Sequence, residues 1–483
     1  MMRSLYSGVS GLRNHQTKMD VIGNNIANVN TVAFKSSAVT FSDIMYQTTQ
    51  AASGATATTG GTNAKQIGLG VATGSTKISI TSAGASESTG NAFDIKLVDS
   101  NSTNFFIVNN GAGNVFTRAG SFYIDGNGNL AMASTGYLVQ GWQAVTNEDG
   151  SIGIRKDTVS SLRIMSPANM TSNPEATENS YASGIVDKND KNIIVSDIDN
   201  PQANEGYAMS FSFYDDLGYA YTAKFALYSD DANAGMGTYR VKLVGIYDSD
   251  NNELLAENGI ATSSIFGHTN NQGGTATTTT DYFTLQFDTA TGAFSYIGEA
   301  GTKSVTMNLD VLGTAIYGSV DASPFSNIDV NFSSLLNQDN GGTSTAGMDR
   351  GSVTNASVGA GKKLGALTGV SVNTSGEIYG SYDNGNTVLL GQIAVAQFSN
   401  ASGLESLGNN CYGETLNSGE FDGIGVDVTA DGGSMLTGQL EMSNVDLAQE
   451  FTSMITTQRG FQANSRIITV SDTMLEELTN LKR

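Results

Sequence analysis

Apolar side chains recur at helical spacing at both ends of the chain. Near the N-terminus they stand alternately four and three positions apart, as on one face of a helix, with two imperfect positions. This first seam contains Leu5, Val9, Leu12, Met19 and Ile26. Toward the C-terminus the apolar positions stand seven apart. This second seam contains Leu447, Met454, Phe461, Ile468 and Leu475, and Phe451 widens it. The pattern predicts helices within 1–30 and 443–483, the second with a capping box at Ser443 and Asp446.

The sequence between these ends is typical of short β-strands. Runs of Val, Ile, Phe and Tyr alternate with Gly and Asn turns, which favours hairpins. The segments read in this way are 104–142, 207–228, 238–255 and 351–399, the second and third each as a hairpin. A polar stretch, 48–66, interrupts the pattern after the first helix and is predicted to be an extended linker. The chain is therefore expected to be mainly β with terminal α-helices.

Composition and charge restrict the possible functions. A chain of 483 residues with 57 Gly and only 4 Pro fits two to four turn-rich domains. Its formal net charge of −22 opposes binding to nucleic acid or to an anionic membrane surface. The N-terminal segment lacks the apolar core of a secretory signal peptide, and no run of 18 apolar residues predicts membrane insertion.

Catalytic and metal-binding patterns are missing from the sequence. His15 and His268 are the two histidines and Cys411 is the one cysteine, which leaves no zinc or Cys/His pattern. We expect Cys411 to be a buried apolar side chain and His15 to make a solvated or inter-subunit polar contact. Segment 125–129 resembles the front of a calcium loop, but Leu130 replaces the required Gly and a hairpin turn is favoured. We therefore expect no enzyme activity, no cofactor and no metal.

The two apolar seams pose a packing problem. Each must be buried on the other helix or on neighbouring chains, because a single pair of helices buries little surface. Three arrangements remain open on periodicity alone. They are a tube of many copies with the helices innermost, a hairpin stalk of one chain, and ordinary core helices of a globular domain.

Four stretches resemble one protein family. "SLYSGVSGLRNHQTKMDVIGNNIANVNTVAFKSS" is similar to the N-terminal signature of bacterial flagellar rod and hook proteins, and "LEMSNVDLAQEFTSMITTQRGFQANSRIITVSDTMLEELTNLKR" to their C-terminal helix. "FFIVNNGAGNVFTRAGSFYIDGNGNLAMASTGYLVQGW" and "LLGQIAVAQFSNASGLESLGNNCYGETLNSGE" look like two halves of their inner β domain. The long middle segment points, within this family, to the hook subunits rather than to the shorter distal rod proteins.

The resemblance implies a structural role outside the cell. Hook subunits polymerise into a curved, flexible tube that acts as a universal joint and transmits torque from rod to filament. The implied partners are further copies of the chain, the rod, hook-cap and hook–filament junction proteins, and the flagellar type III export apparatus. Export by that apparatus would account for an extracellular location without a cleavable signal. The seam residues of both helices would then be the contacts between subunits.

The family signature marks the end of the first helix. Its matched residues are Asn24, Asn25, Ile26, Ala27, Asn28, Asn30, Thr31, Phe34 and Lys35. The asparagines are expected to cap the helix end, to accept left-handed backbone conformations and to bond across subunits. Simple helix termination in a solvated turn is the alternative.

The resemblance also implies nested, discontinuous domains. Both termini would form an inner, coiled-coil-like helical layer, followed outward by a connector and two or more β domains. The expected parts are a helical domain of 1–30 and 443–483, a connector of 31–75 and 433–442, an inner β domain of 76–145 and 346–432, and an outer insert of 146–345. Two rival functions remain. One is an extracellular adhesin or glycan-binding protein using Tyr219, Tyr221 and Tyr228, and the other is a β-rich hydrolase.

Overall fold

The computed structural model describes residues 2–147, 151–199, 206–270, 278–319 and 323–481. The chain forms two compact units. Unit 1 comprises Met1–Asn169, Gly369–Ser381 and Thr387–Arg483, and unit 2 comprises Met170–Thr368 and Tyr382–Asn386. The four-part division expected from the sequence is finer than this, so its bounds stay a prediction.

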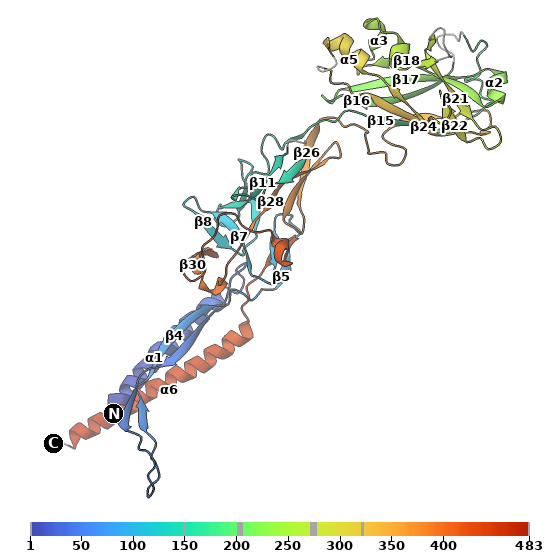
Figure 1. Cartoon of the computed structure of the whole chain (residues 1–483). Helices are drawn as coiled ribbons and strands as arrows, with labels where there is room; N and C mark the ends of the chain where they lie inside the picture. Colours follow the sequence, from blue (N-terminus) through green and yellow to red (C-terminus); the bar gives the residue numbers. More distant parts are fainter. Residues whose placement is uncertain (1, 148–150, 200–205, 271–277, 320–322, 482–483) are drawn as a thin grey trace. The chain divides into compact units, whose positions relative to one another are not determined.

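The predicted terminal helices are present in unit 1. Helix α1 (Met2–Ala27) and helix α6 (Leu447–Asn480) lie side by side (Figure 1). The carboxylate of Asp446 accepts hydrogen bonds from the amides of Ala448 and Gln449 at the start of α6, which makes it the N-cap. The expected capping box with Ser443 is wrong, because Ser443 lies outside the helix and its hydroxyl accepts from the amide of Val445. Among the described helices, none combines the length and the apolar character needed to cross a bilayer.

Short antiparallel strand pairs follow α1 and precede α6. They are β1 (Ser37–Asp43) with β4 (Val71–Ile78), β2 (Tyr46–Gln50) with β3 (Lys65–Gly68), β5 (Ser86–Ser88) with β33 (Gln439–Glu441), and β6 (Ile95–Val98) with β32 (Ser434–Thr437). The linker predicted at 48–66 is therefore wrong. Its ends form the hairpin β2–β3, in which Gln47 pairs with Ile67.

The β part of unit 1 is one large, mostly antiparallel sheet. Its main path runs β14 (Thr171–Ser172), β26 (Gly365–Val372), β27 (Glu377–Tyr382), β28 (Thr387–Ile393), β11 (Leu138–Thr146), β7 (Asn104–Asn109), β8 (Asn114–Thr117), β31 (Cys411–Gly413) and β30 (Glu405–Gly408). Beside this path lie β9 (Phe122–Ile124), β10 (Leu130–Met132), β12 (Ile152–Ile154), β13 (Ser160–Ser161) and β29 (Val395–Gln397), with the short helices η1 (Ala401–Gly403) and η2 (Val428–Asp431). The strands predicted within 104–142 are confirmed. Trp142 is buried in the core and its indole N–H donates to the carbonyls of Asp157 and Ile424.

Unit 2 encloses its own core between two sheets. One sheet has the order β16 (Tyr207–Tyr214), β17 (Ala220–Tyr228), β18 (Thr238–Tyr247), β21 (Tyr282–Phe287), β22 (Phe294–Ile297). The other has the order β23 (Ser304–Met307), β24 (Ile328–Asn337), β15 (Asn179–Val186), β25 (Gly347–Arg350), with β15 and β24 parallel. The remaining elements are β19 (His268–Asn270), β20 (Thr278–Thr280), α2 (Asp231–Gly235), α3 (Leu254–Glu257), α4 (Thr262–Ile265) and α5 (Asp310–Tyr317).

One hairpin prediction in unit 2 is confirmed and the other is wrong. Strands β16 and β17 form the antiparallel hairpin expected at 207–228. The second expected hairpin, at 238–255, is a single strand, β18, that ends at Tyr247. The chain then makes a turn and enters α3, where the carboxylate of Glu253 caps the helix by accepting from the amide of Ala256.

A buried carboxylate fixes one edge of unit 2. Asp187 follows β15 and accepts hydrogen bonds from the amides of Asn189, Asn340 and Gly342 at 2.7–2.9 Å. Burial alone would raise the pKa of Asp187, but these amides outweigh that effect and hold its pKa below the usual range. Asp187 thereby connects β15 to the loop that follows β24, more than 150 positions later in the chain.

We expect Asp187→Ala to destabilise unit 2 by about 1–3 kcal/mol, because the amides of Asn189, Asn340 and Gly342 lose their buried acceptor. Since the pKa is lowered on folding, the stabilisation by Asp187 is complete above the ordinary aspartate pKa of 3.8 and is lost as the pH falls through the folded value. Denaturant unfolding at pH 7 and pH 3 measures both effects, with the exposed Asp250→Ala as the matched control. An Asp187→Ala variant as stable as the control at pH 7 would contradict the assignment.

Candidate assembly surface

Helices α1 and α6 are antiparallel and contact each other through small residues. A Cβ added to Gly8 would lie 3.2 Å from Ile468, and one added to Gly460 would lie 2.8 Å from the ring of His15. Near the far end of the pair, the hydroxyls of Ser4 and Ser471 lie 3.4 Å apart. Such residues let the helix backbones approach closely, but they remove little apolar surface from water.

Among the predicted seam residues, Ile468 lies in this contact, against Gly8, and the others are half-buried or exposed. On α1, Leu5, Leu12, Met19 and Ile26 are half-buried and Val9 is exposed. On α6, Met454, Phe461, Ile468 and Leu475 are half-buried, while Leu447 and Phe451 are exposed. The side chains of α6 that are fully buried are Thr457 and Ser471, both small and polar. The assignment of the seam residues to contacts between subunits stays a prediction.

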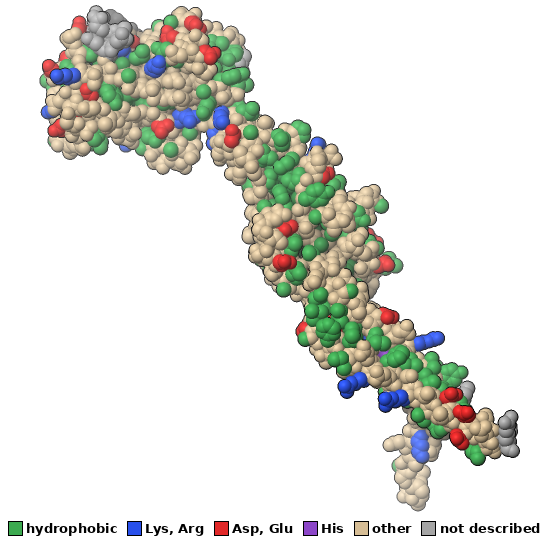
Figure 2. All heavy atoms as spheres, turned by 180° about the vertical axis from the view of Figure 1, so that it is seen from behind, with side chains coloured by type: hydrophobic (Ala, Val, Ile, Leu, Met, Phe, Trp, Pro, Cys, Tyr) green, Lys and Arg blue, Asp and Glu red, His purple; other side chains and the backbone are tan. Residues whose placement is uncertain are grey.

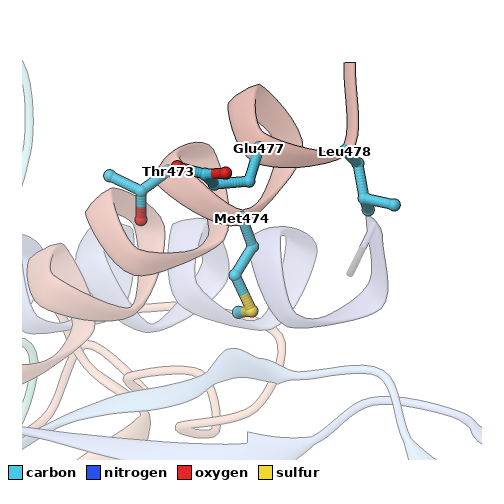
Figure 3. Close-up of a pocket in the computed structure, with 4 residues that line it drawn as sticks. All are labelled: Thr473, Met474, Glu477 and Leu478. Carbon is cyan, nitrogen blue, oxygen red and sulfur yellow. The ribbon is translucent and has the colours of Figure 1, made fainter. Parts of the chain in front are cut away.

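A strip of large apolar side chains on α6 has no cover within the described chain. Ile467, Val470, Met474 and Leu478 form this C-terminal strip at spacings of three and four, and each is 44–55% exposed. It lines two shallow surface grooves of about 320 and 260 Å³, and Figure 3 shows Met474 and Leu478 in the second. Figure 2 shows other hydrophobic side chains on the surface of the same helical region. Apolar strips of this kind mark interaction surfaces.

The hairpin β2–β3 and the end of β1 add further exposed apolar residues. Met45 is 74% exposed and Tyr46 54% exposed, and Ile44 and Ile67 accompany them. The expected connector therefore presents apolar side chains to its surroundings, as the helices do. This distribution differs from that of a polar linker, in which apolar residues of this size would be rare.

The asparagine cluster ends α1 through specific bonds. The side-chain amide of Asn28 donates at 2.9 Å to the carbonyl of Asn24 in the last turn, which also accepts from the backbone amide of Asn28. Asn25 is buried and exchanges two hydrogen bonds with the backbone of Ser37, and it also donates to Glu450 of α6. The end of α1 is therefore held by asparagine side chains and does not terminate simply in a solvated turn. The left-handed residue is Ala33 (φ 56°), so that part of the expectation for the asparagines is wrong.

The rest of the signature divides into surface and buried positions. Asn30 and Ala27 are exposed, whereas Thr31 and Phe34 are half-buried. The hydroxyl of Thr31 donates to the side-chain oxygen of Asn28 at 3.1 Å. Lys35 ends the signature and is fully buried.

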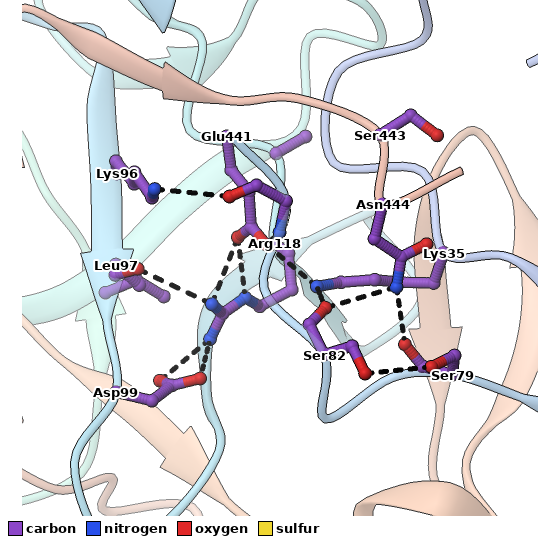
Figure 4. Close-up of polar contacts among 12 residues, drawn as sticks. Lys35, Ser79, Ser82, Lys96, Leu97, Asp99, Arg118, Glu441, Ser443 and Asn444 are labelled. Atoms are coloured by element: carbon purple, nitrogen blue, oxygen red, sulfur yellow. Dashed lines mark hydrogen bonds and ion pairs between the residues drawn. The ribbon is translucent and has the colours of Figure 1, made fainter. Parts of the chain in front are cut away.

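Lys35 belongs to a cluster of four charged side chains shown in Figure 4. Its ammonium lies 2.8 Å from one carboxylate oxygen of Glu441, and the guanidinium of Arg118 lies 3.0 Å from the other. Arg118 also contacts Asp99 at 2.8 Å. Burial lowers the pKa of Lys35, whereas the two cations overcome the opposite effect of burial on Glu441 and hold its pKa low. Sequence analysis did not find this cluster.

The remaining candidate residues, His15, Cys411 and segment 125–129, lie in the packing and turns of the fold. The ring of His15 packs edge-on against Phe41 and is half-buried, and its expected solvated or inter-subunit contact stays a prediction. Cys411 is buried, as expected, and burial raises the pKa of its thiol. Segment 125–129 is the hairpin turn between β9 and β10, with Asp125 accepting from backbone amides. Among the residues that the structure describes, no three His, Cys, Asp or Glu side chains are grouped to hold a metal ion.

The tyrosines considered for ligand binding do not form a common site. Tyr228 is buried, and Tyr221 is half-buried and stacks on Phe213 within unit 2. Burial, followed by the nearby charge of Asp215, raises the pKa of Tyr221. Tyr219 is exposed at the hairpin turn. Packing between strands thus accounts for two of the three side chains.

Models of three families match separate parts of the chain. Residues 5–35 match "Flagella basal body rod protein", and residues 436–481 match "Flagellar basal body rod FlgEFG protein C-terminal". Residues 101–172 match "Flagellar hook protein FlgE/F/G D1 domain". These matches cover α1 with its asparagine cluster, α6 with the C-terminal strip, and much of the large sheet.

Curated relatives match over the whole length of the chain. The flagellar hook protein FlgE of Borreliella burgdorferi is 34% identical over 488 residues, and that of Treponema pallidum is 32% identical over 499 residues. Each alignment covers 100% of both chains. The flagellar basal-body rod protein FlgG of Bacillus subtilis is 29% identical, again over 100% of both chains. The chain therefore belongs to the flagellar hook protein family, whose members are non-enzymatic structural proteins of the extracellular bacterial flagellum.

Proposed function

We propose that this hook-family protein polymerises through its joined chain ends into a curved tube that bends while it transmits torque from rod to filament. The observation that carries the proposal is the C-terminal strip. It exposes four large apolar side chains on a helix whose other side is already occupied by α1. Because both helices belong to every copy, neighbouring copies can bury one another's strips in a repeating, head-to-tail arrangement.

The proposal assigns the assembly contacts to three regions of unit 1. These are the C-terminal strip, the exposed apolar side chains of the two predicted seams, and the hairpin β2–β3. Half-buried residues such as Phe461 and Leu475 would complete their burial when a neighbouring copy packs beside them. Copies held side by side would have a high effective concentration for further contacts along the tube.

The family membership supports further partners for the two ends of such a tube. We include among them the rod, the hook-cap protein, the hook–filament junction proteins and the type III export apparatus.

Electron microscopy of the purified full-length chain, concentrated stepwise, tests the proposal. We expect curved tubes above a threshold concentration, because the apolar contacts of one copy are completed by its neighbours. Straight tubes would favour the alternative of a distal rod protein. The Bacillus subtilis relative is named a flagellar basal-body rod protein. Monodisperse particles at every concentration would contradict polymerisation.

A further inference from the structure

The charge cluster of Lys35, Glu441, Arg118 and Asp99 occupies the place where both chain ends leave the β part of unit 1. Lys35 follows the end of α1, and Glu441 precedes the start of α6. Arg118 and Asp99 belong to the β part, close to β8 and β6. The cluster thus joins three segments that are far apart in sequence, with 406 positions between Lys35 and Glu441.

The cluster is electrically balanced and mostly buried, and only the side chain of Asp99 is partly exposed, at 22%. The side chains of Lys35 and Arg118 are each 1% exposed, and that of Glu441 is fully buried. Two carboxylates and two cations give a net charge of zero. Removal of either Lys35 or Glu441 would leave one uncompensated charge among buried side chains, which is the most damaging change for a buried ion pair.

Backbone bonds tie both chain ends to the same cluster. The ammonium of Lys35 also donates to the carbonyl of Ser82 at 2.7 Å, and the amide of Gly84 donates to the carboxylate of Glu441 at 2.9 Å. The amide of Ala33 donates to the carbonyl of Glu441, and the amide of Ser36 donates to the side chain of Asn444, at 2.8 and 2.7 Å. The exchange rates of the Ala33 and Ser36 amides therefore report on whether both chain ends stay bonded to each other at the charge cluster.

Helices α1 and α6, which lie beyond the charge cluster, are held by weaker contacts within one chain. Apart from buried Ile22 and the bond of Asn25 to Glu450, they meet at small residues such as Gly8 and Gly460. The large apolar side chains of the C-terminal strip remain exposed. Helices that bury little apolar surface are marginal by themselves. In the free chain, persistent order should consequently end near Lys35 and Glu441.

We infer that Lys35 and Glu441 are positioning residues for assembly. Their ion pair locks the roots of α1 and α6 onto the β part of unit 1 and so sets the direction in which both helices meet neighbouring copies. The assembly half of this inference rests on the proposed function. The locking half concerns the single chain and can be tested without any polymer.

Hydrogen exchange on the free full-length chain tests the lock. In Lys35→Met, the pair of Arg118 with Glu441 is retained, so the large sheet should stay folded. We expect the amides of Ala33 and Ser36 to exchange faster by on the order of a hundredfold, while the Ile107 amide in β7 keeps its rate. The charge-matched control is Arg155→Met, which removes an exposed cation of the same unit. Unchanged exchange at Ala33 and Ser36, or an equal rise at Ile107, would overturn the lock.

The subunit concentration needed for tube formation tests the positioning role. Lys35→Met and Glu441→Gln should each raise it at least about tenfold. The double variant restores a net charge of zero in the cluster and should need a lower concentration than Glu441→Gln alone. Such a rescue would show that charge balance in the cluster matters, because a general loss of stability would be larger in the double variant than in either single variant.

Two results would overturn the positioning role. One is normal assembly of both single variants, and the other is a double variant that assembles no better than Glu441→Gln. If the native chain itself forms no tubes, the proposed function fails. The exchange rates of Ala33 and Ser36 then still decide whether Lys35 and Glu441 lock the chain ends.

Discussion

Val470→Asp is expected to abolish tube formation while leaving both β units folded. Val470 lies within the C-terminal strip, between Ile467 and Met474, and is 55% exposed in the single chain. A neighbouring copy that packs on the strip would bury the new carboxylate without a partner, at a cost of about 3–5 kcal/mol per contact. Repeated in every subunit, this cost should raise the concentration needed for assembly more than about a hundredfold.

The control for this variant is the adjacent position on the same helix. Thr469 is exposed and lies outside the strip, so Thr469→Asp adds the same charge to α6 without entering the proposed contact. Electron microscopy and sedimentation measure assembly, and thermal melting checks the β units. If Val470→Asp forms tubes at the native concentration, the C-terminal strip is not a contact between subunits. An equal loss of assembly by Thr469→Asp would contradict the assignment in the same way.

Removal of unit 2 is expected to leave assembly intact and to give straighter tubes. The chain enters and leaves this unit at neighbouring points, since the amide of Leu367 donates to the carbonyl of Met170 at 3.0 Å. A short Gly/Ser linker from Asn169 to Gly369 can therefore replace the segment between them. The helices and the hairpin β2–β3 all lie in unit 1, whereas contacts between copies of unit 2 would be lost.

Electron microscopy beside the native chain measures both effects of this removal. Circular dichroism must first show that the shortened chain is folded. If a folded chain without unit 2 fails to polymerise, unit 2 takes part in the assembly contacts and their confinement to unit 1 is wrong. Tubes with native curvature would contradict the role of unit 2 in bending.

Local patterns in the sequence predicted the elements better than their contacts. The strands within 104–142 were predictable because Gly and Asn turns separate short apolar runs, a signal that depends only on neighbouring residues. The hairpin expected at 238–255 failed because the apolar pair Leu254 and Leu255 suits a short buried helix as well as a strand.

The contact face of the two helices was less predictable. Heptad spacing favours large side chains such as Phe461, but α1 and α6 also approach closely at Gly8 and Gly460, where an added Cβ would lie within 3.2 Å of the other helix. Glycine carries no hydrophobic signal, so a pattern based on apolar residues places the contact beside its real position. The exposed strip is the remaining, uncovered part of the same helix.

The charge cluster could not be predicted from the sequence, for a different reason. Lys35 ends a recognisable signature, but nothing near it in the chain shows that its partner is Glu441. A single sequence does not report pairs of residues this far apart, and an isolated Lys or Glu is usually solvated. The one available signal was a lone glutamate, Glu441, between the apolar residues Leu440 and Met442.

A density map of the assembled tube by electron cryomicroscopy would show which surfaces join the subunits. We expect α6 of each copy to pack against neighbouring copies, with Val470 and Met474 buried in contacts between subunits. We further expect Lys35 and Glu441 to remain paired at the root of the two helices. A tube in which Val470 and Met474 face solvent, held together by other surfaces, would contradict the account.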